Sequence, residues 1–430
     1  MLLGDWYWNQ SSHSKSSFKK LLSIIGDADF HPEDIQNTNW LVVDRELGDL
    51  GTMDVEEWLN EDAGWEHTTI SISVPFRRCS PHPGLIHYST SHFYHRSLVS
   101  IIREKVLDPA HHQLFHYKPY KLQWHPPHKP RNVRVYGELF TSSAFLKAHC
   151  KLQESPAEPE CDLPWWIIAL MFWLDMTQLT SFGDAKLWPM YMYFSNVSKY
   201  ERCQPSSHLC THAVYLQTLP NNFKDFALEH SGSKLPGNTF FTHCHCELFH
   251  AQWQEVLDDD FVQAYEHGMA LTCCDGIQWR LFSRIFIYSA DYPENKHLQP
   301  WLLSMPPMPH PKGRLHNLAS ERDILQHHVL ARQDTEERCK KVADARRLIY
   351  DQQYVVDTSQ VEALLKEESL VPTKNTFSEQ LSHAGFDFFL MLVMDLLHEF
   401  ELGVWKAVFI HLLRMLDSLK GHGLPELDRW

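Results

Sequence analysis

The sequence lacks a hydrophobic run long enough to cross a membrane. Its longest uncharged apolar stretch, Leu163–Leu174, falls well short of the ~20 residues that a spanning helix needs. The first residues, MLLGDWYWNQ, carry no basic segment ahead of an apolar stretch, so they do not resemble a secretory signal. We therefore expect a soluble intracellular protein with no signal peptide and no transmembrane segment.

The chain also has few cations for its length. It holds 39 Lys and Arg against 54 Asp and Glu, which gives a formal net charge of -15 at pH 7. Sequence-independent binding of nucleic acid needs clustered Lys and Arg, because these side chains contact the phosphates. We therefore expect any DNA contact to be local, or to come from another part of the protein.

The cysteines form no even framework of the kind that staples small secreted domains. There are 10, and several are adjacent or nearly so, such as Cys273 and Cys274. We therefore expect reduced thiols. Two adjacent cysteines also cannot easily share one metal ion. Core packing is the default interpretation for this pair.

One cluster of soft side chains invites a zinc interpretation. Its spacing fits no ordinary zinc finger, and it lies in a predicted helix among apolar residues. We favour a packed helix with buried thiols over a metal site. The cluster consists of His243, Cys244, His245, Cys246 and His250.

The composition is that of a globular protein, with 430 residues of which 43% are hydrophobic. The sequence predicts a mixed N-terminal domain over 1–150, followed by the polar linker QESPAEPECDLP. A second region, 163–299, shows strand, strand, strand, helix, strand. The strands are the apolar run before Asp175, WPMYMYFSNV, THAVYLQTLP and RIFIYSA, with the helix over 239–267.

Two acids follow strands of this region. Asp175 ends the run WWIIALMFWLD, and Asp291 follows the run RLFSRIFIYSA. Two cations held between acids can activate a nucleophile and stabilise a leaving oxygen, so such a pair is what metal-dependent phosphoryl transfer needs. An Asp after a strand is more often a turn or cap residue, and the pattern alone does not decide between the two roles.

The remaining residues form two segments. Residues 300–375 are predicted to be a loop and a helical insertion, and 376–430 an apolar helical segment. Within the latter, Asp395 and His398 are three residues apart and Glu399 is four from the aspartate, so a helix would present all three on one face. A buried hydrogen-bonded pair is the alternative to a metal half-site for Asp395 and His398.

A series of motifs, in order, resembles the Plavaka family of fungal transposases, relatives of the CACTA group. The motifs span nearly the whole chain: GDWYWNQ, EDAGW, YHRSLVSIIREK, VYGELFTSSAFLKAH, LMFWLDMTQLTSFGDAKLWP, THCHCELFHAQW, TCCDG, YSADYPE, ALLKEESLVPT and DLLHEFELGVWKAVFIHLLR. This resemblance implies an α/β fold with a ribonuclease H-like mixed sheet core and a helical insertion that leads into a C-terminal bundle. It also implies a nuclear DDE/D transposase whose partner is the DNA of transposon ends.

By this resemblance Asp175 and Asp291 are the first two catalytic acids and hold Mg²⁺ or Mn²⁺. In related transposases a Cys-x-x-Cys pair follows the second acid. Together with a later Asp-x-x-His it forms a metal or structural site. Here Asp395 and His398 keep the second half, but HLQPWLLSMPPMPHPKGRLHN contains no cysteine. The third acid is not identified, and Glu399 and Glu401 are the nearest substitutes.

The sequence therefore predicts a transposon-derived DDE/D transposase whose ancestral activity was DNA cleavage and strand transfer. Because of the two departures, we expect this truncated or degenerate chain to be inactive, and whether it is an enzyme is left open. A catalytically silent remnant that binds DNA or protein is the alternative. Assembly into a homo-oligomer is also left open.

We predict that the purified chain holds no stoichiometric zinc. A closed structural zinc site normally needs four ligands, and the Cys-x-x-Cys half is missing. The measurement is elemental analysis of the protein after dialysis against metal-free buffer. One tightly held zinc per chain would contradict the prediction, and His310 or His316 would then be the first replacement ligands to test beside Asp395 and His398.

Overall fold

The computed structural model describes most of the chain. The described residues are 15–27, 30–31, 33, 64–128, 130–159, 161–175, 177–178, 186–220, 222–232, 235–290, 333–368, 370–393 and 405–418. They divide into two compact units, one made of 1–63 and 177–187 and the other of 64–176 and 188–430. In the first unit, α2 spans Lys15–Ile25, and β6 (Thr177–Gln178) pairs with Leu187 and Lys186.

The second unit is built on a mixed sheet with the strand order β1-β2-β8-β7-β5-β10-β11. From β1 to β5 each neighbouring pair is antiparallel, whereas β10 pairs in parallel with both β5 and β11. The short β9 (Met269–Thr272) pairs antiparallel with the start of β10. The strands are β1 (Trp65–Phe76), β2 (Gly84–Arg96), β5 (Trp165–Leu174), β7 (Lys186–Phe194), β8 (Thr211–Leu216), β10 (Gln278–Ala290) and β11 (Leu392–Val393).

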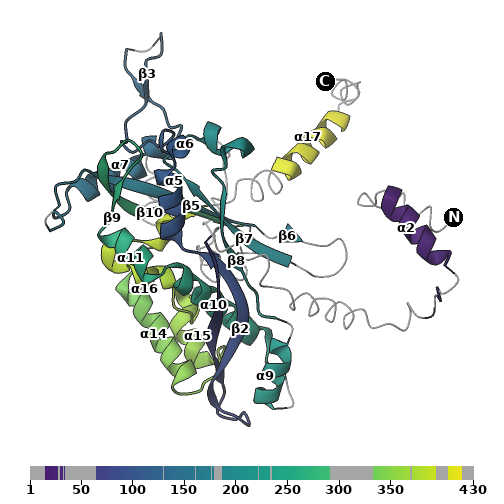
Figure 1. Cartoon of the computed structure of the whole chain (residues 1–430). Helices are drawn as coiled ribbons and strands as arrows, with labels where there is room; N and C mark the ends of the chain where they lie inside the picture. Colours follow the sequence, from purple (N-terminus) through teal and green to yellow (C-terminus); the bar gives the residue numbers. More distant parts are fainter. Residues whose placement is uncertain are drawn as a thin grey trace. The chain divides into compact units, whose positions relative to one another are not determined.

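Helices surround this sheet, and a separate two-stranded ribbon is formed by β3 (Gln123–Trp124) and β4 (Val133–Arg134) (Figure 1). The helices before β9 are α5 (Leu98–Leu107), α6 (Pro109–His112), η2 (Leu139–Thr141), α7 (Ser143–Gln153), α8 (Lys199–Arg202), η3 (Pro205–Ser207), α9 (Phe223–Ser231), α10 (Asn238–Val256) and α11 (Asp259–Glu266). Those after β10 are α14 (Glu336–Tyr350), α15 (Ser359–Leu365), η4 (Lys366–Glu368), α16 (Thr376–Leu381), η5 (Ser382–Ala384), η6 (Phe388–Leu390) and α17 (Lys406–Ser418).

The central strand β5 is buried on both faces. Ile168, Leu170 and Phe172 belong to the larger hydrophobic cluster, which includes α10, whereas Ile167 and Ala169 pack in a smaller cluster with residues of α7. Successive side chains of a strand point to opposite faces, so a nearly continuous apolar run is what such a strand requires. This explains why the sequence of β5 shows no polar alternation.

Trp253 of α10 holds the larger cluster together. Its side chain is fully buried, and its ring centroid lies 5.6 Å from that of Phe172 on β5 and 5.7 Å from that of Tyr288 on β10. The ring of Phe377, at the start of α16, is 4.5 Å away. One indole therefore contacts the two central strands and the helical segment that follows them.

The strands predicted from the sequence are confirmed for β5, β7, β8 and β10. The first and fourth of them, β5 and β10, pair in parallel. The predicted helix over 239–267 is present as α10 and α11, which are separated where Asp258 caps α11 by accepting from the Phe261 N–H at 2.7 Å. Helices α14 and α15 confirm helical structure within the segment 300–375.

Two sequence-based expectations need correction. The segment 376–430, expected to be helical, is not helical throughout, because Phe388–Leu390 is a single 3₁₀ turn and Leu392–Val393 pairs with β10. A short apolar run does not distinguish helix from strand. Here Leu392 and Val393 pair with Tyr288 and Ser289 of β10, so the run forms a strand. The side chains of Trp405, just before α17, and of Leu412 within it are each 48% exposed, so they are not in the centre of a bundle.

The sheet also crosses the boundary placed near residue 150. β2 pairs with β8 at Tyr94↔Tyr215 and His95↔Val214, so the segment before that boundary contributes two strands to the same sheet. The sequence gives no local signal for this pairing, because it joins residues far apart in the chain. The domain limits themselves stay a prediction.

Asn196 fixes β5 to the loop that follows α6. Its fully buried side chain accepts from the Ala169 N–H at 2.7 Å and donates to the carbonyl oxygens of Ile167 (2.8 Å) and His116 (3.2 Å). An unpaired backbone group in the interior is costly. The side chain therefore satisfies three groups that no strand partner satisfies within the described residues.

We predict that Asn196→Ala lowers the free energy of unfolding by about 2–4 kcal/mol, because it leaves buried backbone groups without partners. Urea unfolding followed by circular dichroism is the measurement. Asn222→Ala is the matched control, since Asn222 is exposed and accepts only a surface bond from the Tyr88 hydroxyl at 2.8 Å. We expect the control to cost less than ~1 kcal/mol, and equal losses in the two variants would contradict the assignment.

Candidate functional site

The first candidate acid, Asp175, stands at the carboxyl end of β5 and is exposed. The residue before it, Leu174, pairs with Ala290 of β10 on one side and with Met190 of β7 on the other. Asp175 therefore follows the last paired residue of the central strand. Its carboxylate is available to solvent, in keeping with a role in binding a cation rather than in core structure.

The second candidate, Asp291, lies outside the described residues. It is the residue that follows Ala290 in the sequence, and Ala290 is the last residue of β10. Asp395, His398, Glu399 and Glu401 also lie outside the described residues, between β11 and α17. The structure thus describes the ends of β5, β10 and β11, the three parallel strands after which these acids come.

A β-bulge in β10 sets which side chains share a face with those of β5. Ile285 pairs with Leu170 and Ile287 with Met171, so Phe286 is an extra residue on β10. A bulge shifts the alternation of the residues beyond it. Because of it, Tyr288 pairs with Phe172 and points to the same face, where both rings contact Trp253.

Aromatic side chains occupy the face of the sheet on which Asp175 falls by alternation. Trp173 on β5 packs edge-on against Tyr193 of β7, with ring centroids 5.4 Å apart. Tyr191 of β7 packs against His212 of β8 at 4.7 Å. Burial, followed by a hydrogen bond with Cys210, raises the pKa of Tyr193, so its hydroxyl stays protonated at neutral pH.

The His and Cys cluster of α10 packs against α14 and the segment before α16. Cys244 and Cys246 are buried, and burial raises the pKa of both thiols, to about 12 for Cys246. The Nε2 atom of His243 lies 3.0 Å from the hydroxyl of Tyr350 on α14. The burial of both thiols and of His243 agrees with the packed-helix interpretation of the sequence.

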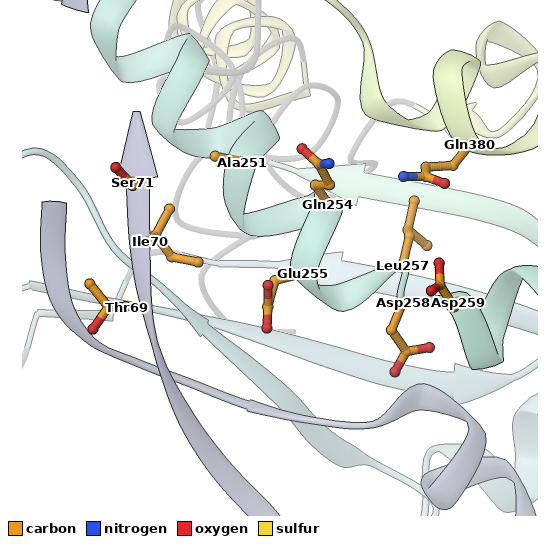
Figure 2. A pocket seen from close by; sticks show the side chains of 10 residues that line it. All are labelled: Thr69, Ile70, Ser71, Ala251, Gln254, Glu255, Leu257, Asp258, Asp259 and Gln380. Atoms are coloured by element: carbon orange, nitrogen blue, oxygen red, sulfur yellow. The ribbon is translucent and has the colours of Figure 1, made fainter. Parts of the chain in front are cut away.

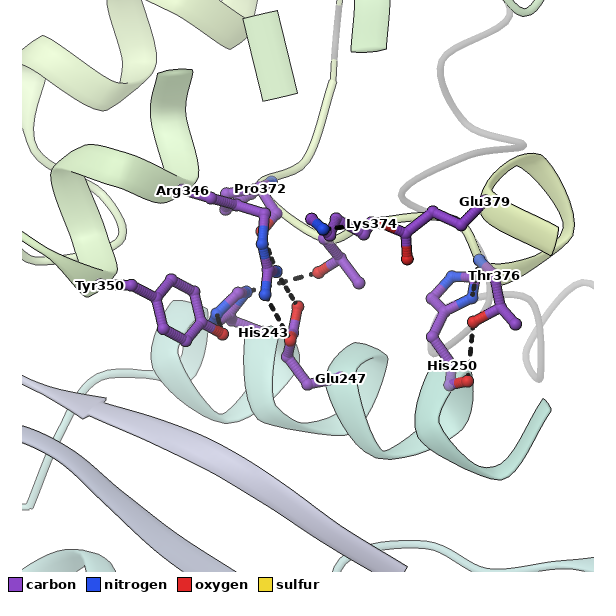
Figure 3. A network of polar contacts seen from close by, with 10 residues as sticks. His243, Glu247, His250, Arg346, Tyr350, Pro372, Lys374, Thr376 and Glu379 are labelled. Atoms are coloured by element: carbon purple, nitrogen blue, oxygen red, sulfur yellow. Dashed lines mark hydrogen bonds and ion pairs between the residues drawn. The ribbon is translucent and has the colours of Figure 1, made fainter. Parts of the chain in front are cut away.

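These contacts include an ion pair that the sequence did not predict, between Glu247 and Arg346. Together with the contacts of His243 and His250 on α10 we call this network the clamp. Arg346 of α14 binds Glu247 of α10 through both of its terminal nitrogens, with 3.1 Å between Nη2 and Oε2, and also donates to the carbonyl oxygen of Pro372 at 3.0 Å. Figure 3 shows the guanidinium between α10 and the segment before α16. Burial alone would raise the pKa of Glu247. The interactions with His243 and Arg346 outweigh this effect, so the pKa of Glu247 is lowered.

His250 joins α10 to α16. Its Nδ1 accepts from the Thr376 N–H at 3.3 Å, and its carbonyl oxygen accepts from the Thr376 hydroxyl at 2.8 Å (Figure 3). An acceptor nitrogen carries no proton, so the geometry needs a neutral imidazole. Burial lowers the pKa of His250 to about 4, with smaller opposing effects of Glu247, which raises it, and Arg346, which lowers it.

A cavity of about 310 Å³ lies between β1 and the end of α10 (Figure 2). Three carboxylates line it, those of Glu255, Asp258 and Asp259, and burial raises the pKa of Asp258. Asp258 is already engaged as the cap of α11. Its acidic lining makes this cavity unsuited to DNA phosphates.

Two further findings concern the described residues alone. No group of three or more His, Cys, Asp or Glu side chains among them could hold a metal ion. Among the same residues, no helix combines the length and the apolar character that a membrane span demands.

We predict that the protein loses stability as the pH falls from about 6.5 to about 4. A histidine whose pKa is lower in the folded state is protonated first in the unfolded chain, so acid favours unfolding until the folded pKa is reached. For His250, a fall in pKa from 6.5 to about 4 corresponds to at most about 3 kcal/mol. Urea unfolding across this pH range is the measurement.

His250→Asn is the matched variant for this prediction. The amide oxygen of asparagine can replace Nδ1 as an acceptor but does not titrate, so the pH dependence should become shallower while stability at pH 7.5 changes little. Part of the dependence should remain, because burial also lowers the pKa of His243. An unchanged pH profile in His250→Asn would show that His250 does not contribute.

Of three comparisons with known proteins, the one with family models gives a match. Neither the curated proteins nor the solved structures gave a match. A family model described as Plavaka transposase matches residues 52–413, which include all the described strands and nearly all of the motifs that suggested the resemblance. Because this match covers well over half of the sequence, the chain belongs to the Plavaka transposase family.

Proposed function

We propose that the larger unit is a ribonuclease H-like core that supports metal-dependent cleavage and strand transfer of transposon-end DNA in the nucleus. The observation that carries the proposal is the parallel pairing of β5 with β10, which ends at Leu174↔Ala290. A ribonuclease H-like sheet has its first and fourth strands side by side, and β5 and β10 are the first and fourth strands of the region predicted from the sequence. Membership of a transposase family supports DNA as the substrate.

The register supports Asp175 and Asp291 as the catalytic acids. The two residues come immediately after Leu174 and Ala290, which are partners in the sheet. If the pairing continued by one residue, the acids would be partners on one face, opposite to the face of Phe172 and Tyr288. If β10 had no bulge, Phe286 would pair with Met171 and the partner of Asp175 would be Ala290, so Asp291 would lie on the opposite face.

The position of strand β11 supports a proposal for which residue supplies the third acid. It is parallel to β10 and pairs with it at Tyr288↔Leu392 and Ser289↔Val393. The carboxyl ends of neighbouring parallel strands meet at one edge of a sheet, and Asp395 is two residues beyond Val393. We therefore propose Asp395 as the first candidate, ahead of Glu399 and Glu401.

Carboxylates are the ligands that Mg²⁺ and Mn²⁺ prefer, and the exposed Asp175 fits that requirement. When bound, such ions would lower the pKa of an attacking water or 3′-hydroxyl and neutralise charge at the phosphate. The contribution of the chain itself is positioning, because the β5–β10 register sets the spacing of its acids. Trp173 and Tyr193 form an apolar border on the Asp175 face.

The catalytically silent alternative rests on a specific observation, the absence of Cys-x-x-Cys from the segment after Asp291. In that case the core would bind DNA without cutting it. Metal binding by the chain, and cleavage once the missing segments are supplied, separate these two functions, because a silent core that has lost its acid cluster would hold no divalent ion.

We predict that the chain binds Mn²⁺ and that Asp175→Asn or Asp291→Asn weakens this binding roughly tenfold or more, since each removes a ligand. Titration followed by electron paramagnetic resonance of free Mn²⁺ is the measurement. Asp162→Asn, an exposed aspartate ahead of β5, is the matched control and should bind as the unchanged chain does. Asp395→Asn, Glu399→Gln and Glu401→Gln then identify the third ligand.

Cleavage is tested on duplexes that carry the terminal sequences flanking the coding region. We expect no cleavage by the chain alone, and Mg²⁺- or Mn²⁺-dependent cleavage once a Cys-x-x-Cys segment and downstream sequence from an intact relative are supplied. That cleavage should be lost in Asp175→Asn and Asp291→Asn. If neither substitution affects Mn²⁺ binding or cleavage, the proposed site is wrong.

A further inference from the structure

The ribbon segment, residues 118–136, is a basic island in an acidic chain. Between Asp108 and Glu138 the sequence has no Asp or Glu, although the chain as a whole has a net charge of -15. The same interval contains five cationic side chains, those of Lys118, Lys121, Lys129, Arg131 and Arg134. A local positive field of this kind is the electrostatic requirement for contact with DNA phosphates.

The ribbon segment has a defined structure. Gln123 pairs with Arg134 and Trp124 with Val133, and the Val135 N–H donates to the Leu122 carbonyl oxygen at 2.9 Å. The loop between the two strands, HPPHKPRN, includes three prolines, which restrict its backbone. In Figure 1 the ribbon projects beyond α6 and α7, away from the sheet.

Three aromatic side chains of the ribbon segment have large exposed fractions. Trp124 is 57% exposed, Tyr136 67% and Tyr120 46%. The guanidinium of Arg134 lies over the ring of Tyr136, 4.9 Å from its centroid. Exposed aromatic rings beside cations are the combination with which proteins stack unpaired bases and contact the adjacent backbone.

The described cations of the ribbon segment have no ion pair with neighbouring acids among the described residues. Within the described part of the chain, Lys118, Lys121 and Arg131 form no ion pair. The nearest acid along the sequence, Glu138, already accepts from the Lys199 N–H at 3.1 Å and lies 3.8 Å from Arg202. The positive field of the ribbon is therefore available to a partner.

The base of the ribbon is attached to the central strand. His116 stacks on Phe140 with ring centroids 4.4 Å apart, and its carbonyl oxygen accepts from Asn196, which also binds Ala169 of β5. Asp175 is six residues further along the chain, or ~20 Å at the rise of a strand. The point where the ribbon is anchored on β5 is therefore less than one turn of B-DNA, about 34 Å, from Asp175.

We propose that the ribbon segment is a DNA-binding arm that contacts phosphates through Lys118, Lys121 and Arg131 and stacks an unpaired base on Trp124. The preferred ligand is duplex DNA with a short single-stranded extension, because a paired base offers no free face to an exposed indole. Binding by this arm does not require the metal site, and it is independent of whether the core is catalytically active.

The test measures fluorescence anisotropy of the full chain with a labelled duplex bearing a single-stranded extension, in EDTA and over a range of NaCl concentrations. The combined variant Lys118→Gln/Lys121→Gln/Arg131→Gln should bind more weakly, and its salt slope should fall by roughly 2–3, since each phosphate contact contributes a little less than one. The control Lys224→Gln/Lys340→Gln/Lys366→Gln removes the same charge from exposed positions elsewhere and should retain the slope.

Trp124→Ala tests the stacking contact. It should weaken binding to the extended duplex roughly 5- to 100-fold, since stacking is worth about 1–3 kcal/mol per base, and should change binding to a blunt duplex far less. Thermal unfolding checks that both variants fold, which the exposure of these side chains favours. Use of EDTA removes the metal, so failure of the catalytic proposal would leave this result unchanged.

Three results would overturn the proposal. One is equal salt slopes in the ribbon variant and its control. Another is an equal effect of Trp124→Ala on extended and blunt duplexes. The third is tighter binding to RNA of the same sequence than to DNA, which would assign the arm to a different nucleic acid.

Discussion

The parallel pairing of β5 with β10 is the interaction on which the larger unit depends. It joins two segments separated by the whole of β7, β8 and α10, and it places the ends of both strands at one edge of the sheet. The pairing is stabilised from both sides, by Trp253 on one face and by the cluster that includes Phe145 and Phe282 on the other. A substitution that shifts this register would move the acid-bearing ends apart without altering either acid.

The predicted insertion after β10, which contains α14, α15 and α16, is attached to this core by polar contacts as well as by apolar packing. The Glu247–Arg346 pair and the His250–Thr376 bonds connect α10 to α14 and α16. Buried polar groups of this kind are costly when unpaired, so they favour one docked arrangement over many similar apolar ones. We infer that the clamp specifies where the insertion docks, while Trp253 and Phe377 supply apolar contact.

The sequence predicted the parts of this structure that have a strong local signal. The strands β5, β7, β8 and β10 are apolar or aromatic runs bounded by turn formers, and Asp175 was correctly placed after the first of them. The Glu247–Arg346 pair was not predictable, since it joins residues 99 apart in the sequence. Neither was β11, because two extended residues in an apolar stretch have no period of their own. The arm formed by β3 and β4 had a usable signal, the absence of acids between Asp108 and Glu138, but aromatic and proline-rich segments resemble ordinary loops.

The position of the insertion has a consequence for how the family can vary. The 101 residues between Ala290 and Leu392 connect two neighbouring strands of one sheet. The entropy of closing a connection rises only slowly with its length, by about 0.6 kcal/mol for each doubling. Relatives could therefore lengthen, shorten or exchange this segment at little cost to the sheet, as long as an arginine still meets Glu247. The core would then act as a constant frame, and differences between relatives would concentrate in the segment that it carries.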